Sequence, residues 1–188
     1  MSVRFTIAAA ATLLTTLLFA QNDTVSTDDV KVPQEAVVVL SPTQGHQVAG
    51  TLLLKQTKEG VRVTGKVSGI KPGKHGFHIH QYGDLRDPQG KSAGGHFNPE
   101  DTKHGGPDAA KHHAGDLGNI TANAEGTATV DKLAKGLKLH LIIGRSVVVH
   151  NHADDLKSQP SGDAGPRIAL GVIGLADIKQ FNVTSASK

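Results

Sequence analysis

Short stretches in which apolar and polar residues alternate predict most of the secondary structure of this chain. Val61, Val63 and Val67 alternate with polar residues, so one face of this stretch is expected in a core and the other in water. Further apolar or alternating runs predict strands at 36–40, 50–56, 127–130, 137–141, 146–150 and 168–175. No long amphipathic helical pattern and no internal repeat accompanies them. Several short strands separated by glycine turns predict an all-β sandwich or barrel.

Two long regions lack this alternation. Residues 81–118 are rich in Gly, Asp, His and Pro, and residues 151–166 have a similar but shorter composition. Loops of this length inside a compact domain usually carry function. We therefore expect the chemistry of the protein in these two loops and at the strand ends beside them.

Residues 1–20 have the pattern of a secretory signal peptide. Arg4 supplies the positive start, residues 5–19 are apolar apart from four threonines, and Ala20 is a small residue at a plausible cleavage point. The alternative is a transmembrane anchor, but the stretch is shorter than the roughly 20 apolar residues that span a bilayer. We expect a cleaved signal, no membrane association afterwards, and a secreted protein (periplasmic if the host is a bacterium).

The rest of the 188-residue chain is long enough for one domain with a sizeable core. We expect a flexible lead-in at residues 21–34, the folded domain at 35–176 and a polar tail at 177–188. The formal net charge is only +3 and the basic residues form no runs, so a nucleic-acid partner is not expected. The chain has no cysteine, which excludes thiolate metal sites, cysteine nucleophiles and lipid attachment through cysteine.

Seven residues of the kinds that bind metal ions lie at unusual density along the domain: His78, His80, His96, His104, His113, Asp116 and His150. Imidazole is the commonest protein ligand for copper and zinc, and a carboxylate can complete a zinc site. So many histidines in so short a span indicate two neighbouring metal sites.

The spacing of these residues suggests how they divide. His78 and His80 are two residues apart in a strand-like segment, so both imidazoles are expected on one face, as the start of a copper site. His150 ends a later strand and can join this pair through folding. Three histidines and a carboxylate would make a tetrahedral zinc site from His96, His104, His113 and Asp116.

Each histidine taken alone can also be interpreted as a structural or solvent-exposed residue that binds no metal. A single His-x-His is a weak signal, and a lone loop histidine is more often solvated than bound to metal. We interpret five further histidines as structural or surface residues: His46, His75, His112, His140 and His152.

Several segments, found together in this order, resemble the copper/zinc superoxide dismutase family. The resemblance covers residues 36–176 and rests on Gly76-Phe77-His78-Ile79-His80, Ser92-Ala93-Gly94-Gly95-His96-Phe97-Asn98-Pro99, Lys103-His104-Gly105-Gly106-Pro107, Gly115-Asp116-Leu117-Gly118-Asn119, Ile142-Ile143-Gly144-Arg145, Val148-Val149-His150 and Gly171-Val172-Ile173-Gly174. It implies an immunoglobulin-like fold: an eight-stranded Greek-key β-barrel or sandwich with two long functional loops.

The resemblance also implies roles for single residues. The copper ligands would be His78, His80, His96 and His150, and His96 would bridge to a zinc ion completed by His104, His113 and Asp116. Asp154 resembles the carboxylate that links His78 and His104 and orients their rings. Arg167 resembles the arginine that attracts and orients the anionic substrate, superoxide.

The implied reaction is disproportionation of superoxide in two half-reactions. One superoxide is oxidised to oxygen as Cu(II) is reduced, and a second takes up protons and leaves as hydrogen peroxide as copper is reoxidised. The imidazole of His96 is implied to release copper and take a proton on reduction, and to return both on reoxidation. Zinc has no redox chemistry and would hold that imidazole and the loop.

The chain departs from the family pattern in two places. The family usually has a disulfide between the first long loop and the last strand, and here the matching positions are Gly90 and Leu170. Since a disulfide contributes about 2–4 kcal/mol, we expect zinc binding in residues 81–118 to replace part of the restraint. The second loop is short, with few charges beyond Asp154 and Asp155, so weaker attraction of the substrate is expected.

Three other functions compete with the enzyme. A secreted copper- and zinc-binding buffer protein could use the same residues. A copper-delivery protein would need soft ligands such as paired cysteines, which this chain does not have. A purely structural sandwich would not need seven metal-ligand residues. The intact ligand residues and Arg167 favour the enzyme. Segments at Tyr82-Gly83-Asp84, Ile143-Gly144 and Val172-Ile173-Gly174 resemble dimer contacts of the family, so a homodimer is expected.

Overall fold

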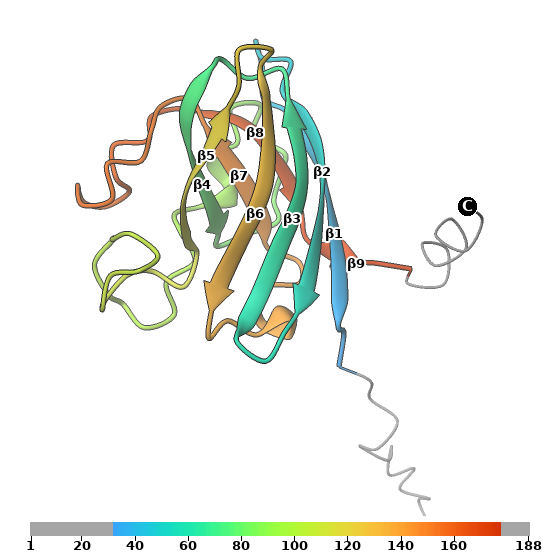
Figure 1. The fold of residues 1–188 in the computed structure, drawn as a ribbon, viewed down its shortest axis with the longest axis vertical. Helices are drawn as coiled ribbons and strands as arrows, with labels where there is room; N and C mark the ends of the chain where they lie inside the picture. The colour runs from blue at the N-terminus through green and yellow to red at the C-terminus, as the bar shows by residue number, and fades with distance from the viewer. Residues whose placement is uncertain (1–31, 178–188) are drawn as a thin grey trace, which may run out of the picture. The chain divides into compact units, whose positions relative to one another are not determined.

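Antiparallel strands build the part of the chain that the computed structural model describes, residues 32–177 (Figure 1). The strands are β1 (Glu35–Pro42), β2 (Ala49–Gln56), β3 (Gly60–Ser68), β4 (Gly73–His80), β5 (Asp116–Ala122), β6 (Thr127–Lys135), β7 (Ser146–His150), β8 (Arg167–Val172) and the two-residue β9 (Gly174–Leu175). Within residues 32–177 the helical structure is limited to two 3-10 turns, η2 (Lys91–Ala93) and η3 (Leu139–Leu141).

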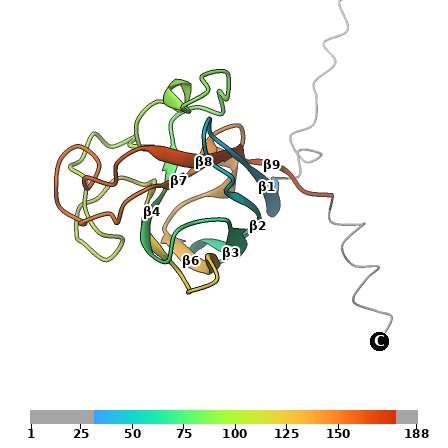
Figure 2. The ribbon, with the colours of Figure 1, turned by 90° about the horizontal axis from the view of Figure 1, so that it is seen from above.

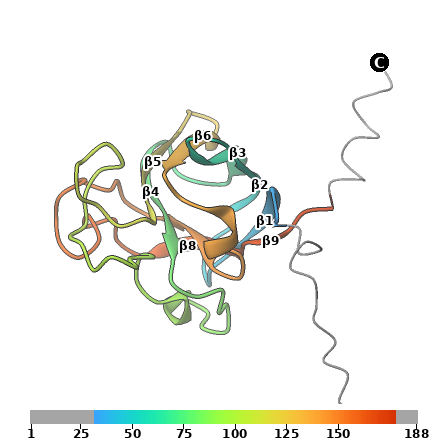
Figure 3. The same ribbon diagram turned by 90° about the horizontal axis from the view of Figure 1, so that it is seen from below.

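The eight longer strands form a nearly closed barrel. Their spatial order is β5-β4-β7-β8-β1-β2-β3-β6, and β9 pairs with the beginning of β1. The end strands β5 and β6 follow each other in the chain through a turn closed by hydrogen bonds between Asn123 and Gly126 and between Asn123 and Thr127. Views along the strands show them arranged in a ring (Figures 2 and 3). The predicted all-β Greek-key barrel is confirmed.

The alternation predicted for β3 is present in the structure. Val61, Val63 and Val67 are fully buried, whereas Arg62 and Lys66 face solvent. Burying a valine or leucine side chain contributes about 1.5–3 kcal/mol, so these inward residues and their neighbours on β2 stabilise the barrel.

Strand β4 is buried on both faces, which is why it can carry the site. All six residues from His75 to His80 are buried. Phe77 and Ile79 belong to the hydrophobic core inside the barrel. Because side chains alternate along a strand, His78 and His80 point to the opposite face, where the long loops cover them.

Two stretches differ from the prediction. The leucine alternation at 137–141 predicted a strand, but the chain forms the turn η3 there: Leu137 and Leu139 are buried and Leu141 is 49% exposed. The side chain of Gln56 accepts a hydrogen bond from the Leu139 N–H at 2.7 Å, so a side chain satisfies the backbone in place of a neighbouring strand. The sequence pattern predicts no strand at β5: residues 116–118 fall in the first loop, and 119–122 carry no strand prediction, because Asp-Leu-Gly-Asn contains residues that are depleted in strands.

Two long connections leave the barrel: residues 81–115 join β4 to β5, and residues 151–166 join β7 to β8. The yellow-green part of the first and the orange second project from the same side of the barrel in Figure 1 and lie close together in Figures 2 and 3. The Gln159 side chain joins them, because it accepts from the His104 N–H at 2.9 Å and donates to the His104 carbonyl at 2.9 Å. The loops therefore form one cover over the outer face of β4.

Some predictions concern residues that the structure does not describe. The signal peptide at 1–20 lies outside the described residues, as do most of the lead-in and of the polar tail. Within residues 32–177, no helix has the length and apolar character needed to cross a membrane.

Candidate metal centre

Four histidines converge in a buried group that we call the first set: His78, His80, His96 and His150. His78 and His80 come from β4, His150 ends β7, and His96 lies in the first loop, bridged to His80 by strand-like pairing. One nitrogen from each ring lies within 4.8 Å of the others. The Nε2 atoms of His80 and His150 are 3.3 Å apart, so the predicted same-face pair and the distant His150 do meet.

The outer nitrogens of the first set are held by hydrogen-bond acceptors. His80 Nδ1 lies 2.9 Å from the Gly94 carbonyl, His150 Nδ1 lies 2.9 Å from the Gly165 carbonyl, and His78 Nε2 lies 2.8 Å from Asp154 Oδ2. Because these partners only accept, each outer nitrogen carries the proton and each inner nitrogen presents a lone pair. His78 Nδ1 and His96 Nε2 are buried without any hydrogen-bond partner. Converging, unpartnered lone pairs are the donor arrangement that suits a metal ion.

Burial keeps these rings neutral and ready to bind. It lowers the pKa of His78 to about 4, against the opposing hydrogen bond to Asp154. It also lowers the pKa of His150 to about 3, with a further contribution from His78. The pKa of His80 is lowered in the same direction, again by burial first. Neutral imidazole is the form that coordinates metal.

The second set combines three histidines with one carboxylate: His96, His104, His113 and Asp116. Asp116 Oδ1 lies 2.7 Å from His96 Nδ1, 3.1 Å from His104 Nδ1 and 3.2 Å from His113 Nδ1. The other oxygen of Asp116 accepts from the backbone N–H groups of Gly105 and His113, at 3.1 and 2.8 Å, so the carboxylate is held in place. Three nitrogens and one oxygen in a closed, buried group suit a structural zinc ion.

The charge at the second set favours a cation. Burial acts to lower the pKa of His104, but hydrogen bonds and charge from Asp116 and Asp154 outweigh burial and raise the pKa to about 9. Burial likewise acts to raise the pKa of Asp116, yet the hydrogen bonds to His104 and His96 lower it strongly. The site thus stabilises positive charge at its centre, as a proton or as a metal ion.

His96 belongs to both sets. Its Nδ1 atom faces Asp116 in the second set, while its Nε2 atom is the unpartnered atom facing the first. Its ring centroid is 3.9 Å from that of His78 and 5.4 Å from that of His113. One imidazole can therefore bridge two metal ions.

Asp154 joins the two sets from outside. Its Oδ2 atom accepts from His78 Nε2 at 2.8 Å, and its Oδ1 atom lies 3.0 Å from His104 Nε2. Asn119 holds the backbone of Asp154 through two hydrogen bonds, of 2.8 and 2.9 Å. The position of Asp154 therefore controls the orientation of one ring in each set.

Gly162 is a structural requirement of this site that sequence reasoning missed. A Cβ atom at Gly162 would lie 1.8 Å from Asp154 Oδ1 and 2.6 Å from His104 Nε2, and the residue has a φ of +68°. Only glycine fits both restrictions. A glycine beside Asp163 in a polar loop carries no signal of this in the sequence.

Arg167 lies at the mouth of the first set. It lines a cavity of about 400 Å³ together with His80, His96 and His150. Its guanidinium donates hydrogen bonds to the carbonyls of Gly90 and Gly94. The Gly94 carbonyl also accepts the hydrogen bond from His80, so Arg167 and a histidine of the first set share one hydrogen-bond acceptor.

The positions that match the family disulfide are in direct contact. A Cβ atom at Gly90 would lie 3.2 Å from Leu170 Cδ1. Leu170 is 5% exposed and packs with Ala93 and Val148 in a small apolar cluster of its own. An apolar side chain in a small cluster therefore adjoins Gly90, whose carbonyl binds Arg167, where the family has a covalent link.

The five remaining histidines lie outside both sets. His75 is buried and has a structural role, because Nδ1 lies 2.8 Å from the His150 carbonyl and Nε2 lies 2.8 Å from the Lys71 carbonyl. His112 lies 2.7 Å from the carbonyl of His113 through Nδ1. His140 and His152 are exposed.

Comparison with known proteins agrees with this geometry. The family model of copper/zinc superoxide dismutase matches residues 48–173. The chain belongs to this family. A solved structure described as that of the clock protein EA4 is similar over 78% of this chain and 97% of its own length, with 39% sequence identity and a TM-score of 0.70.

The two sets match the copper and zinc sites of the copper/zinc superoxide dismutase family. The donors present also fit these ions: four nitrogens in the first set and three nitrogens with one oxygen in the second. The atoms that would bind them include His78 Nδ1 and His96 Nε2 in the first set, which have no hydrogen-bond partner, and His104 Nδ1 in the second set, which faces Asp116 Oδ1 at 3.1 Å.

The metal-free protein is expected to lose stability as the pH falls from about 6.5 towards about 4. His78 and His150 have folded pKa values of about 4 and about 3, below the ordinary 6.5, so in this range the unfolded chain binds protons that the folded chain does not. His104, with a folded pKa of about 9, opposes the loss only near pH 6.5, where the unfolded chain is still partly deprotonated at this residue, and adds no slope at lower pH. Thermal unfolding of the apo-protein followed by circular dichroism at several pH values measures the effect, and a melting temperature that stays level or rises on acidification would contradict it.

Proposed function

We propose that the protein is a superoxide dismutase that converts two superoxide ions and two protons into oxygen and hydrogen peroxide. The observation that carries the proposal is the shared cavity in which Arg167 lies beside three histidines of the first set. A cation next to a copper-type site suits a small anionic substrate. Family membership supports the same reaction.

Copper bound at the first set would supply the one-electron exchange, and zinc at the second set has no redox chemistry. The residues of the chain supply binding and proton handling. Arg167 uses two hydrogen bonds to hold its own position, and the other N–H groups of the guanidinium, which form no further hydrogen bond within residues 32–177, can bind and orient superoxide. His96 can hold a proton at Nε2, facing the cavity, while Asp116 anchors the Nδ1 side of the same ring.

Arg167→Gln is expected to slow superoxide decay about tenfold or more at low salt, because the loss of charge removes attraction and orientation of the anion. The measurement is stopped-flow decay of superoxide, normalised to bound copper, at several salt concentrations. Arg62→Gln serves as the control, since Arg62 is exposed on β3 and paired with Asp131. The control is expected to give the same rate of superoxide decay as the unchanged protein at each salt concentration.

Full copper loading with decay no faster than the background in solution would overturn the enzymatic proposal. That result would favour the alternative function, a copper- and zinc-binding buffer protein on the same fold. If the rate depends on salt but is the same in Arg167→Gln, the proposed reaction would stand and the role assigned to Arg167 would be refuted.

We also propose that the protein forms a homodimer. Large apolar side chains are exposed around β1, β8 and β9, with Val39 64%, Val172 37% and Leu175 64% exposed. Tyr82, 58% exposed, adjoins this face through Gly83, whose Cβ would lie 2.3 Å from the Gly144 carbonyl and 3.2 Å from Val172. An exposed apolar patch of this kind indicates an interface, and a second copy would cover it with the same residues.

Val172→Lys is expected to shift the protein from dimer to monomer at micromolar concentration, because burying an unpaired ammonium at the centre of the patch is unfavourable. Light scattering measures the mass. Val32→Lys, which changes an exposed valine ahead of β1, is expected to leave the dimer intact. An unchanged protein that is monomeric throughout this range would remove the proposal.

A further inference from the structure

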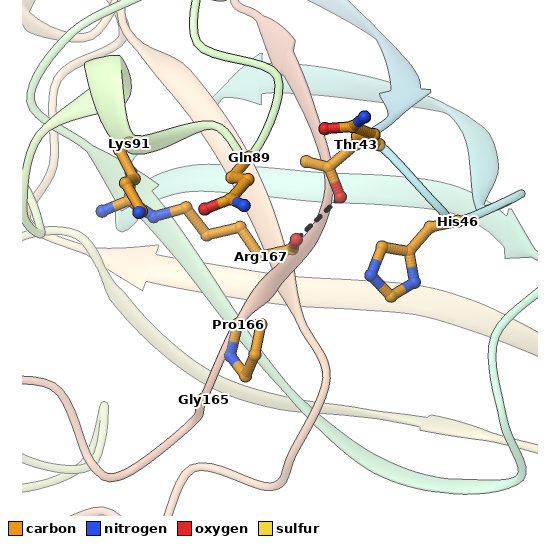
Figure 4. A pocket seen from close by; sticks show the side chains of 8 residues that line it. Thr43, His46, Gln89, Lys91, Gly165, Pro166 and Arg167 are labelled. Atoms are coloured by element: carbon orange, nitrogen blue, oxygen red, sulfur yellow. Dashed lines mark hydrogen bonds between the residues drawn. The ribbon is translucent and has the colours of Figure 1, made fainter.

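A second cavity, of about 460 Å³, lies next to Arg167 and contains none of the residues of the two metal sets. Figure 4 shows side chains that line it, among them Thr43, His46, Gln89 and Lys91. The cavity shares Gly165 and Arg167 with the metal cavity, so Arg167 lies in the wall between the two. Its size is within the range of about 300–1,000 Å³ that is usual for small-molecule sites and exceeds what superoxide requires.

The walls of this cavity come from three segments that hydrogen bonds tie together. Thr43 Oγ1 donates to the Arg167 carbonyl at 2.8 Å, which joins the end of β1 to the start of β8 (Figure 4). The Gln44 N–H donates to the Pro88 carbonyl at 2.8 Å, which joins the same segment to the first loop. A cavity held in this way is formed before a ligand arrives, so binding costs little ordering.

The first-loop wall is fixed separately. Asp87 Oδ1 accepts from the backbone N–H groups of Gln89 and Lys91, at 3.0 and 2.8 Å. The carboxylate of Asp87 is thus engaged with the backbone, and the residues lining the cavity include no acidic side chain. Within residues 32–177, the ammonium of Lys91 forms no ion pair.

Side chains with nitrogen donors lie at both ends of the cavity. In the view of Figure 4 the side chains of Lys91 and Arg167 reach the same end of the cavity, His46 lies at the other end, and Gln89 lies between them. Lys91 and Arg167 both carry positive charge, and an anion bound between two like charges relieves their repulsion. The side-chain amide of Gln89 can form a hydrogen bond with a ligand that lies between the two ends of the cavity.

We propose that this cavity binds a small organic dianion of the dicarboxylate class. One carboxylate would lie between Lys91 and Arg167, the second would face His46, and the short carbon chain between them would pass Gln89 and the ring of Pro166. This site goes beyond the proposed function, because it takes a different ligand and lies outside the two metal sets, although it shares Arg167 with the site proposed for superoxide.

The test is a calorimetric titration of the copper- and zinc-loaded protein with succinate. Succinate is expected to bind with a dissociation constant of about 1 mM or tighter. Lys91→Gln is expected to weaken binding about tenfold or more, because it removes a charge-assisted contact. Lys66→Gln, on an exposed position of β3, is the matched control and is expected to bind as the unchanged protein does.

Two further observations locate the site and its preference. Amide shifts in the Cu(I)- and zinc-loaded protein are expected at Gln44 and Gln89, and not at Gly95 and Ser161 in the metal cavity. Butyrate, a monoanion of the same length, is expected to bind much more weakly than succinate. No succinate binding, equal binding by Lys91→Gln, equal affinity for butyrate, or shifts confined to the metal cavity would each overturn the proposal.

Discussion

Asp154→Asn is expected to weaken binding at both metal sets at once, by about 10- to 100-fold for each ion. Asp154 accepts from His78 in the first set and from His104 in the second. An asparagine of the same size carries no negative charge, so both rings lose the charge that favours the proton on their outer nitrogens, and its NH2 group cannot accept from a ring N–H. A single substitution thus acts on two sites.

The measurement is metal content by mass spectrometry together with chelator competition for copper and for zinc. Asp155→Asn is the matched control, because Asp155 is the neighbouring residue, is exposed, and bonds within its own turn to Lys157 and Ser158. The control is expected to keep both affinities. If Asp154→Asn kept them as well, or lost only one, the joint role of Asp154 would be refuted.

Removing zinc is expected to lower the melting temperature by about 10 °C or more. Zinc at about a thousand times its dissociation constant stabilises the folded state by about 4 kcal/mol. In a chain of this length each kcal/mol corresponds to about 2–4 °C. The effect should be large here because the chain has no cysteine, and the contact between Leu170 and Gly90 supplies only apolar packing where the family has a covalent link.

Differential scanning calorimetry of the apo-protein, with and without added zinc, measures this shift. His104→Ala, which removes one nitrogen of the second set, is expected to abolish most of the increase on zinc addition. His140→Ala changes an exposed histidine outside both sets and is expected to keep it. An apo-protein that melts at the temperature of the zinc-loaded protein would show that zinc does not replace the missing restraint.

Patterns along the chain predicted the elements whose side chains follow a simple period. The valines of β3 alternate because one face of that strand lies in the core, and the two long loops stood out because they lack any period. The same rule was wrong at residues 137–141, since two buried leucines two positions apart also occur in a tight turn. It also predicted no strand at β5, where Asp116 combines a strand position with a ligand role.

The sequence by itself determined which metal-donor atoms are available: nitrogen and oxygen, without cysteine sulfur. The family resemblance, which also rests on the sequence, divided these donors into two sets. Only the tertiary structure decided that these donors converge. His150 meets His80 because β7 pairs with β4, and a pairing between strands some 70 residues apart leaves no local trace in either segment.

Backbone groups contributed what the sequence does not display at all. The carbonyls of Gly90 and Gly94 hold Arg167, and the Gly94 carbonyl also sets the proton position on His80. Every residue has such a carbonyl, so residue type gives no sign of which ones bind. The orientation of the rings, and with it the direction of their lone pairs, therefore depends on the folded backbone, whereas the identity of the donors depends on the sequence alone.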